Sequence, residues 1–88
     1  MSLENYRKEI DKIDNQILEL LAKRDKEVEK VKKFKEENDM PKIQSSRWEK
    51  VLQEKVEKGK ILGVQEGLIR EIWEAIHKYS LKKQNNEQ

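Results

Sequence analysis

Hydrophobic residues recur along the N-terminal part of the chain at the three- and four-residue steps that place side chains on one face of a helix. This stripe consists of Leu3, Tyr6, Ile10, Ile13, Ile17, Leu20, Val31 and Phe34. Between Leu20 and Val31 it carries Arg24 and Glu27 instead, and Lys35 returns to nearly the face of Arg24 because eleven residues are close to three turns. A stripe that changes from apolar to cationic is a poor coiled-coil seam, and it indicates a pocket for an anion.

Two breaks divide the chain into three predicted helices, so the expected fold class is all-α. The first break is Asn38-Asp39-Met40-Pro41, because Asn and Asp favour turns and Pro41 disfavours helical geometry at the residue before it. Ser46-Arg47-Trp48-Glu49 then fits a capping box, with Ser46 as the N-cap of the second helix and Gly59 as its stop. The predicted helices span about residues 3–37, 46–58 and 64–84, with a frayed tail at 85–88.

The first predicted helix is too long for a compact subunit. Its roughly 35 residues would extend about 52 Å, whereas a compact protein of 88 residues has a radius of gyration of about 12 Å. Half of the apolar stripe would therefore project into water. Pairing with the same helix of a second copy would bury it, so we expect an intertwined homodimer.

Composition narrows the class of protein. Residues 1–88 are expected to form one domain, and with 34% hydrophobic and 43% charged residues its core must be thin, as in helical bundles. The chain has no cysteine and one histidine, which excludes a disulfide framework and a Cys/His zinc site; we expect no metal and no cofactor.

No apolar run suits a membrane span and the N-terminus does not resemble a signal peptide, so we expect a cytoplasmic protein. Acids interspersed among the basic residues leave a net charge of +2, which argues against nucleic-acid binding.

Several motifs, in order and at fixed spacing, carry a family resemblance. The run YRKEIDKIDNQILELLAKR at 6–24 is similar to the opening R-x-x-I-D-x-I-D-x-x-I-L-x-L-L-x-x-R of all-helical (AroQ-type) chorismate mutases. The resemblance covers essentially residues 4–84, through VKKFK at 31–35, the Pro41 turn and Arg47, to SLKKQ at 80–84. It implies an isomerase of the shikimate pathway that rearranges chorismate to prephenate in aromatic amino-acid biosynthesis. It also implies three-helix subunits that share two active sites in a homodimer.

The segment MPKIQSSRW at 40–48 further resembles mutase domains fused to a 3-deoxy-heptulosonate-phosphate synthase. The chain is thus either a free enzyme or one domain of such a fusion.

The resemblance also implies the roles of individual residues. The catalytic residues would be Lys35, Gln84 and Arg24, and the substrate-binding residues Arg7, Arg47, Ser80 and Gln44. Lys35 and Gln84 would hydrogen-bond the ether oxygen of chorismate, Ser80 would contact a carboxylate, and Arg7 would reach in from the partner subunit. Arginine suits the two substrate carboxylates because its planar guanidinium binds them bidentately.

The reaction itself is an intramolecular rearrangement, which needs neither a nucleophile nor a proton shuttle. Cationic side chains would hold the dicarboxylate in its compact conformer, and donors at the ether oxygen would stabilise the charge that develops there. The chain departs from the family in two places. Trp48 stands where many members have an acid that contacts the ring hydroxyl, and Gln44 replaces a common Asp. We expect Gln44 or backbone amides to bind the hydroxyl. We expect Trp48 to pack between helices, with a place in a lid over the pocket as the alternative.

Each of these roles has a structural alternative. Arg7 can form a surface pair with Asp11, Arg24 can pair with an acid of the second subunit, and Lys35 and Arg47 can be surface cations. His77, with no proton to move in this reaction, is expected to be a packed or surface histidine, and Trp73 and Tyr79 to be core residues. Two other functions also remain: an isochorismate pyruvate-lyase with a similar cationic pocket, and a non-enzymatic helical dimerisation module.

Overall fold

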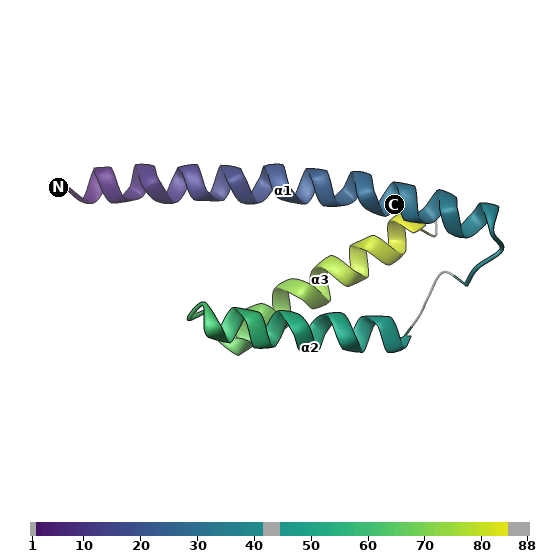
Figure 1. Cartoon of the computed structure of the whole chain (residues 1–88). Helices are drawn as coiled ribbons and strands as arrows, with labels where there is room; N and C mark the ends of the chain where they lie inside the picture. The colour runs from purple at the N-terminus through teal and green to yellow at the C-terminus, as the bar shows by residue number, and fades with distance from the viewer. Residues whose placement is uncertain (1, 42–44, 85–88) are drawn as a thin grey trace.

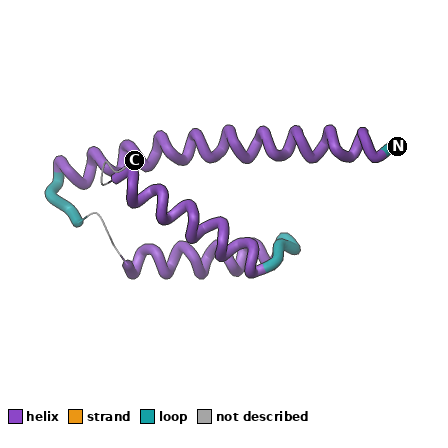
Figure 2. Tube along the Cα trace, turned by 180° about the vertical axis from the view of Figure 1, so that it is seen from behind, coloured by secondary structure: helices purple, strands orange, loops and turns teal. Residues whose placement is uncertain are grey.

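The protein folds as three α-helices in a computed structural model that describes residues 2–41 and 45–84 (Figure 1). The helices are α1 (Leu3–Glu37), α2 (Ser45–Ile61) and α3 (Glu66–Gln84). The described residues form no strand (Figure 2). The all-α prediction and the long N-terminal helix are therefore confirmed. The predicted tail at 85–88 lies outside the described residues.

Local signals define both ends of α1. The Ser2 side chain caps the first turn by accepting a hydrogen bond from the backbone N–H of Asn5. At the other end, Asp39 adopts a left-handed conformation with φ of 53°. The N–H of Met40 then reaches back to the carbonyl of Lys35 at 2.8 Å, which is the bond of a Schellman motif. The turn expected after residue 37 is confirmed.

The end of α2 differs from the prediction. Gly59 does not stop the helix, which continues to Ile61. The stop is Gly63, with φ of 84°, and the N–H of Val64 closes a second Schellman motif by donating to the carbonyl of Gly59 at 2.9 Å. At the other end α2 begins at Ser45, so Ser46 lies inside the first turn and not at the predicted N-cap.

Gly59 serves packing instead. The two buried hydrophobic side chains among the described residues are Val56 on α2, 5% exposed, and Ile69 on α3, 3% exposed. A Cβ on Gly59 would collide with the side chain of Ile69. The missing side chain thus lets α3 approach α2 closely, and the remaining length of α3 crosses to pack against α1 (Figures 1 and 2).

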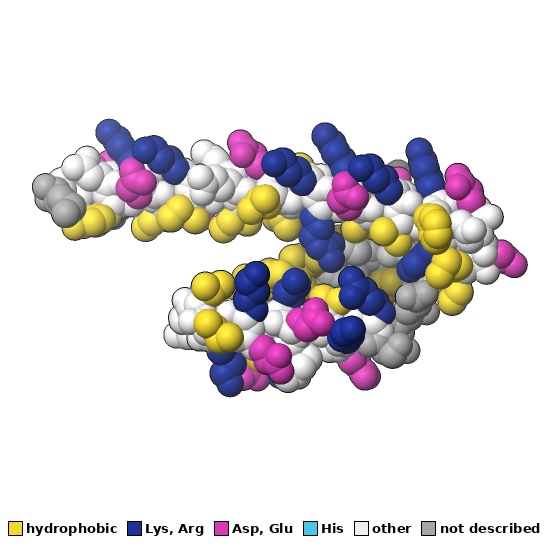
Figure 3. Space-filling model, in the orientation of Figure 1, with side chains coloured by type: hydrophobic (Ala, Val, Ile, Leu, Met, Phe, Trp, Pro, Cys, Tyr) yellow, Lys and Arg dark blue, Asp and Glu magenta, His cyan; other side chains and the backbone are white. Residues whose placement is uncertain are grey.

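The N-terminal half of α1 projects beyond the other two helices (Figure 1). The radius of gyration is 16.1 Å and the longest dimension 56 Å, whereas a compact chain of this length would have a radius of gyration of about 12 Å. Hydrophobic side chains line one side of this projecting half (Figure 3). At least half of the surface of each is exposed for Leu3, Tyr6, Ile10, Ile13 and Ile17. A continuous apolar face is therefore left uncovered within the single chain.

Helix α3 buries little of its own apolar face. Tyr79, expected in the core, is 61% exposed, and the ammonium groups of Lys78 and Lys82 lie over its ring.

Among the described residues, no helix is both long and apolar enough to cross a membrane. The cytoplasmic location stays a prediction.

Candidate active site

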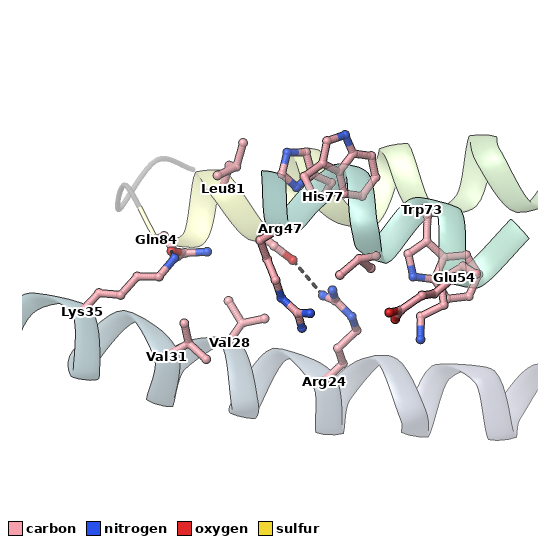
Figure 4. A pocket seen from close by; sticks show the side chains of 14 residues that line it. Arg24, Val28, Val31, Lys35, Arg47, Glu54, Trp73, His77, Leu81 and Gln84 are labelled. Carbon is pink, nitrogen blue, oxygen red and sulfur yellow. Dashed lines mark hydrogen bonds between the residues drawn. The ribbon is translucent and has the colours of Figure 1, made fainter. Parts of the chain in front are cut away.

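A pocket of about 570 Å³ lies between the C-terminal half of α1 and helix α2, with α3 as its third wall (Figure 4). Its lining comprises Arg24, Val28, Val31 and Lys35 from α1; Arg47, Trp48, Val51, Glu54 and Lys55 from α2; and Trp73, His77, Ser80, Leu81 and Gln84 from α3. The α1 residues follow helical spacing, because 24, 28, 31 and 35 return to one face. The pocket begins where the apolar stripe of α1 becomes cationic.

Arg24 points from α1 into the middle of this pocket (Figure 4). One of its guanidinium nitrogens donates a hydrogen bond of 2.8 Å to the hydroxyl oxygen of Ser80 on α3. Both residues are half-buried. The bond joins residues 56 positions apart and fixes one part of the guanidinium, so that its other N–H donors have a defined direction.

Lys35 and Gln84 form a second polar pair at the other end of the pocket. The Lys35 ammonium donates to Gln84 Oε1 at 3.2 Å, and Gln84 is only 9% exposed. With its oxygen engaged by Lys35, the side-chain amide of Gln84 presents its nitrogen on the side away from Lys35 (Figure 4). Two different kinds of N–H donor therefore stand next to each other at this end.

The charge of the lining is mostly positive. Among the described residues it contains four cationic side chains, Arg24, Lys35, Arg47 and Lys55, and one carboxylate, Glu54. Arg47 is exposed on α2 and extends toward α1, while Glu54 lies on the far side of Arg24 from Lys35 (Figure 4). A half-enclosed space with this balance favours an anion, and in particular one with more than one negative charge.

An aromatic stack forms part of the wall formed by α2 and α3. The rings of Trp48 and His77 lie nearly parallel, 11° apart in orientation, with centroids separated by 4.0 Å. Burial, and secondarily the positive charge of Arg24, lowers the pKa of His77 below its usual value of 6.5. Trp48 thus packs between helices, as expected, and its packing partner is a polar ring in the pocket.

The structure brings together five of the seven site residues expected from the sequence: Arg24, Lys35, Arg47, Ser80 and Gln84. Arg7 lies far from them on the projecting half of α1, where it pairs with Glu4 at 3.3 Å and not with Asp11. Gln44 lies outside the described residues. No cluster of three or more metal-ligating side chains occurs within residues 2–41 and 45–84.

His77, expected to be a packed or surface histidine, and Trp73, expected in the core, both line the pocket. The spacing of 73, 77, 80, 81 and 84 was the available signal, because these positions share one face of a helix. Ser80 and Gln84, expected in the site, therefore implied that face.

Comparison with models of protein families identifies the family of this chain. The family model described as chorismate mutase type II matches residues 6–85, which include all three helices from Tyr6 onward. Comparisons with curated proteins and with solved structures each gave no match. Because the match extends over nearly the whole chain, the protein belongs to the chorismate mutase type II family, a family of isomerases.

Proposed function

We propose that the pocket between α1, α2 and α3 binds chorismate and rearranges it to prephenate by restricting its conformation and stabilising charge on its ether oxygen. The observation that carries this proposal is the pair of donor clusters in one pocket, Arg24 with Ser80 and Lys35 with Gln84. The family match supports the reaction, and the geometry supports the mechanism.

The first cluster would orient the substrate. Chorismate carries two carboxylates, and its enolpyruvyl side chain must fold over the ring before the new carbon–carbon bond can form. Arg24, held by Ser80, binds one carboxylate, and Arg47 approaches the same space from α2. Fixing the charged groups restricts the substrate to the compact conformer, so that binding free energy replaces much of the entropy cost of reaching it.

The second cluster would act on the reacting atoms. As the ether bond breaks, negative charge develops on its oxygen. The Lys35 ammonium and the Gln84 amide nitrogen both donate toward that position, and the near-complete burial of Gln84 strengthens the interaction by excluding water. Since the oxygen is more negative in the transition state than in the substrate, these donors stabilise the transition state preferentially.

The proposed enzyme is a homodimer in which Arg7 completes the pocket of the partner subunit. Arg7 lies 17 residues before Arg24, about 25 Å along a rigid helix, and so cannot reach its own pocket. The exposed apolar face of α1 gives the second subunit a surface to cover.

A fused or associated synthase domain, the other partner expected from the sequence, also stays a prediction.

The decisive experiment supplies chorismate to the purified protein and follows its loss together with the appearance of prephenate. Lys35→Ala should remove most of the rate, whereas Lys33→Ala, an exposed lysine two positions away, should leave it unchanged. Isochorismate is supplied in parallel. Release of pyruvate from isochorismate without turnover of chorismate would assign the pocket to the lyase instead. Because the chain belongs to a family of isomerases, an enzymatic function is favoured over that of a non-enzymatic helical dimerisation module.

A further inference from the structure

One polar ring in the pocket has no role in the mechanism above. His77 is half-buried, lines the pocket together with Arg24, and lies across the pocket from α1 (Figure 4). Its stack on Trp48, with centroids 4.0 Å apart, holds the imidazole plane in place. A titratable ring is therefore fixed in the wall of a pocket whose charge suits an anion.

The charged side chains that line the pocket with His77 are mostly positive. Helix α1 contributes Arg24 and Lys35 to the lining, and α2 contributes Arg47, Lys55 and the carboxylate of Glu54. An imidazolium among these groups is disfavoured by repulsion as well as by burial. The lowered pKa of His77 has the same two causes, with burial the larger and Arg24 the second.

A bound dicarboxylate would reverse this balance. Its two negative charges would offset the cations, and a carboxylate beside Arg24 would attract a positive charge on the imidazole in the same pocket. We propose that His77 is a further substrate-binding residue: when a dicarboxylate binds beside Arg24, the imidazole takes up a proton and its cation joins Arg24 in holding the carboxylate. This inference rests on the proposed function, because that function assigns the dicarboxylate to the pocket.

Proton uptake makes binding depend on pH in a defined direction. If the pKa of His77 is higher in the complex than in the protein alone, affinity strengthens as the pH falls through the pKa of the complex. It levels off below the pKa of the protein alone. Each unit of difference between the two pKa values corresponds to a limit of about tenfold in affinity. Carboxylates stay ionised above about pH 5.5, and His77 is the one histidine of the chain, so a change between about pH 5.5 and 7 reports on this residue.

The single histidine also makes the test direct. The imidazole signal of the wild-type protein is titrated by NMR, alone and with saturating prephenate, the dicarboxylate product of the proposed reaction. We expect its pKa to rise by at least about one unit, the scale of an opposite charge within hydrogen-bonding range. Calorimetry in two buffers of different ionisation enthalpy should show uptake of a fraction of a proton near pH 6.5. The dissociation constant for prephenate should fall severalfold when the pH is lowered from 7.5 to 5.5.

Three variants separate binding from packing. His77→Gln is neutral at every pH, so its affinity for prephenate should not vary over this range. Lys78→Gln removes the adjacent cation from the exposed side of α3 and should keep the wild-type pH dependence. Trp48→Leu removes the stack and admits water, so the pKa of His77 in the protein alone should move back toward 6.5 and rise less on binding.

The outcomes distinguish this inference from the proposed function. Saturation with prephenate that leaves the pKa of His77 unchanged overturns the inference, whatever the turnover of chorismate. A rise of the pKa in a protein that does not convert chorismate would keep the inference and overturn the proposed reaction. Failure of prephenate to bind at any pH would overturn the inference, whereas the chorismate assay decides the proposed reaction on its own.

Discussion

Replacing Gly59 with alanine should destabilise the protein, although alanine is the better helix former. Gly59 lies within α2, where a glycine costs about 1 kcal/mol relative to alanine, so propensity alone favours the replacement. The new methyl group would, however, overlap Ile69 Cδ1 and lie 2.9 Å from Ile69 Cγ1. Ile69 is 3% exposed and cannot move into solvent. Overpacking of this kind costs about 1–3 kcal/mol, so we expect a net loss of up to about 2 kcal/mol.

Gly67→Ala provides the matched control. Gly67 lies in the first turn of α3, and no atom lies within 4 Å of the position its Cβ would occupy. The same substitution there should stabilise the protein by about 0.5–1 kcal/mol. The two variants are therefore expected to change stability in opposite directions, because Ile69 lies against Gly59 whereas no atom lies against Gly67.

Urea unfolding followed by circular dichroism measures both effects. All proteins are compared at one concentration, because the stability of an oligomer depends on it. Ile69→Val removes the Cδ1 atom, so Gly59→Ala should cost less in that background than in the wild type. If Gly59→Ala proved as stable as Gly67→Ala, or if the cost were independent of Ile69, the assigned role of Gly59 would be wrong.

Three further predictions concern assembly and the proposed site. The exposed apolar face of α1 predicts a dimer at micromolar concentration, with a melting temperature that rises with protein concentration; sedimentation of a folded 10.6 kDa monomer would contradict this. Arg24→Ala should lower kcat/KM for chorismate by at least about 100-fold while the dimer survives, and Lys23→Ala, exposed one position away, should not; near-normal activity of folded Arg24→Ala would exclude the anchor role. Arg7→Ala and Arg24→Ala subunits, each nearly inactive alone, should recover activity on mixing, because one pocket of the heterodimer then carries both lesions and the other carries neither. Subunits that exchange without recovery would place Arg7 outside the partner's pocket.

The ends of the helices show how far local sequence signals extend. The end of α1 could be predicted because the residues that form its Schellman motif lie within the turn itself, from Lys35 to Met40. The end of α2 was predicted four residues too early relative to Gly63, because a glycine that stops a helix and a glycine that admits a neighbouring helix look alike in sequence. Only the contact with Ile69, ten residues further on in the chain, distinguishes the two.

The site residues divide in the same way. Arg24 could be identified from periodicity alone, since it interrupts an apolar stripe. Lys35 lies on nearly the same face but is one of many lysines in a charged stretch, so the family resemblance was needed to select it. Ser80 and Gln84 carry no such signal, and the family resemblance was needed to select them. Their partners on α1 lie 56 and 49 positions away in the chain, so the hydrogen bonds that give them a role appear only in the folded protein.

The stack of Trp48 on His77 could be predicted neither from periodicity nor from the family resemblance. Taken alone, Trp48 was a departure from the family's usual acid, and His77 was a histidine with no proton to move in the reaction. Their rings lie 4.0 Å apart, so the two residues form one structural unit. The tryptophan removes a possible negative charge from the pocket wall and covers a ring that can become positive there. In the proposed complex with a dicarboxylate, both features would act in the same direction. Trp48 replaces a carboxylate that would repel the substrate, and His77 can add a positive charge that would attract it.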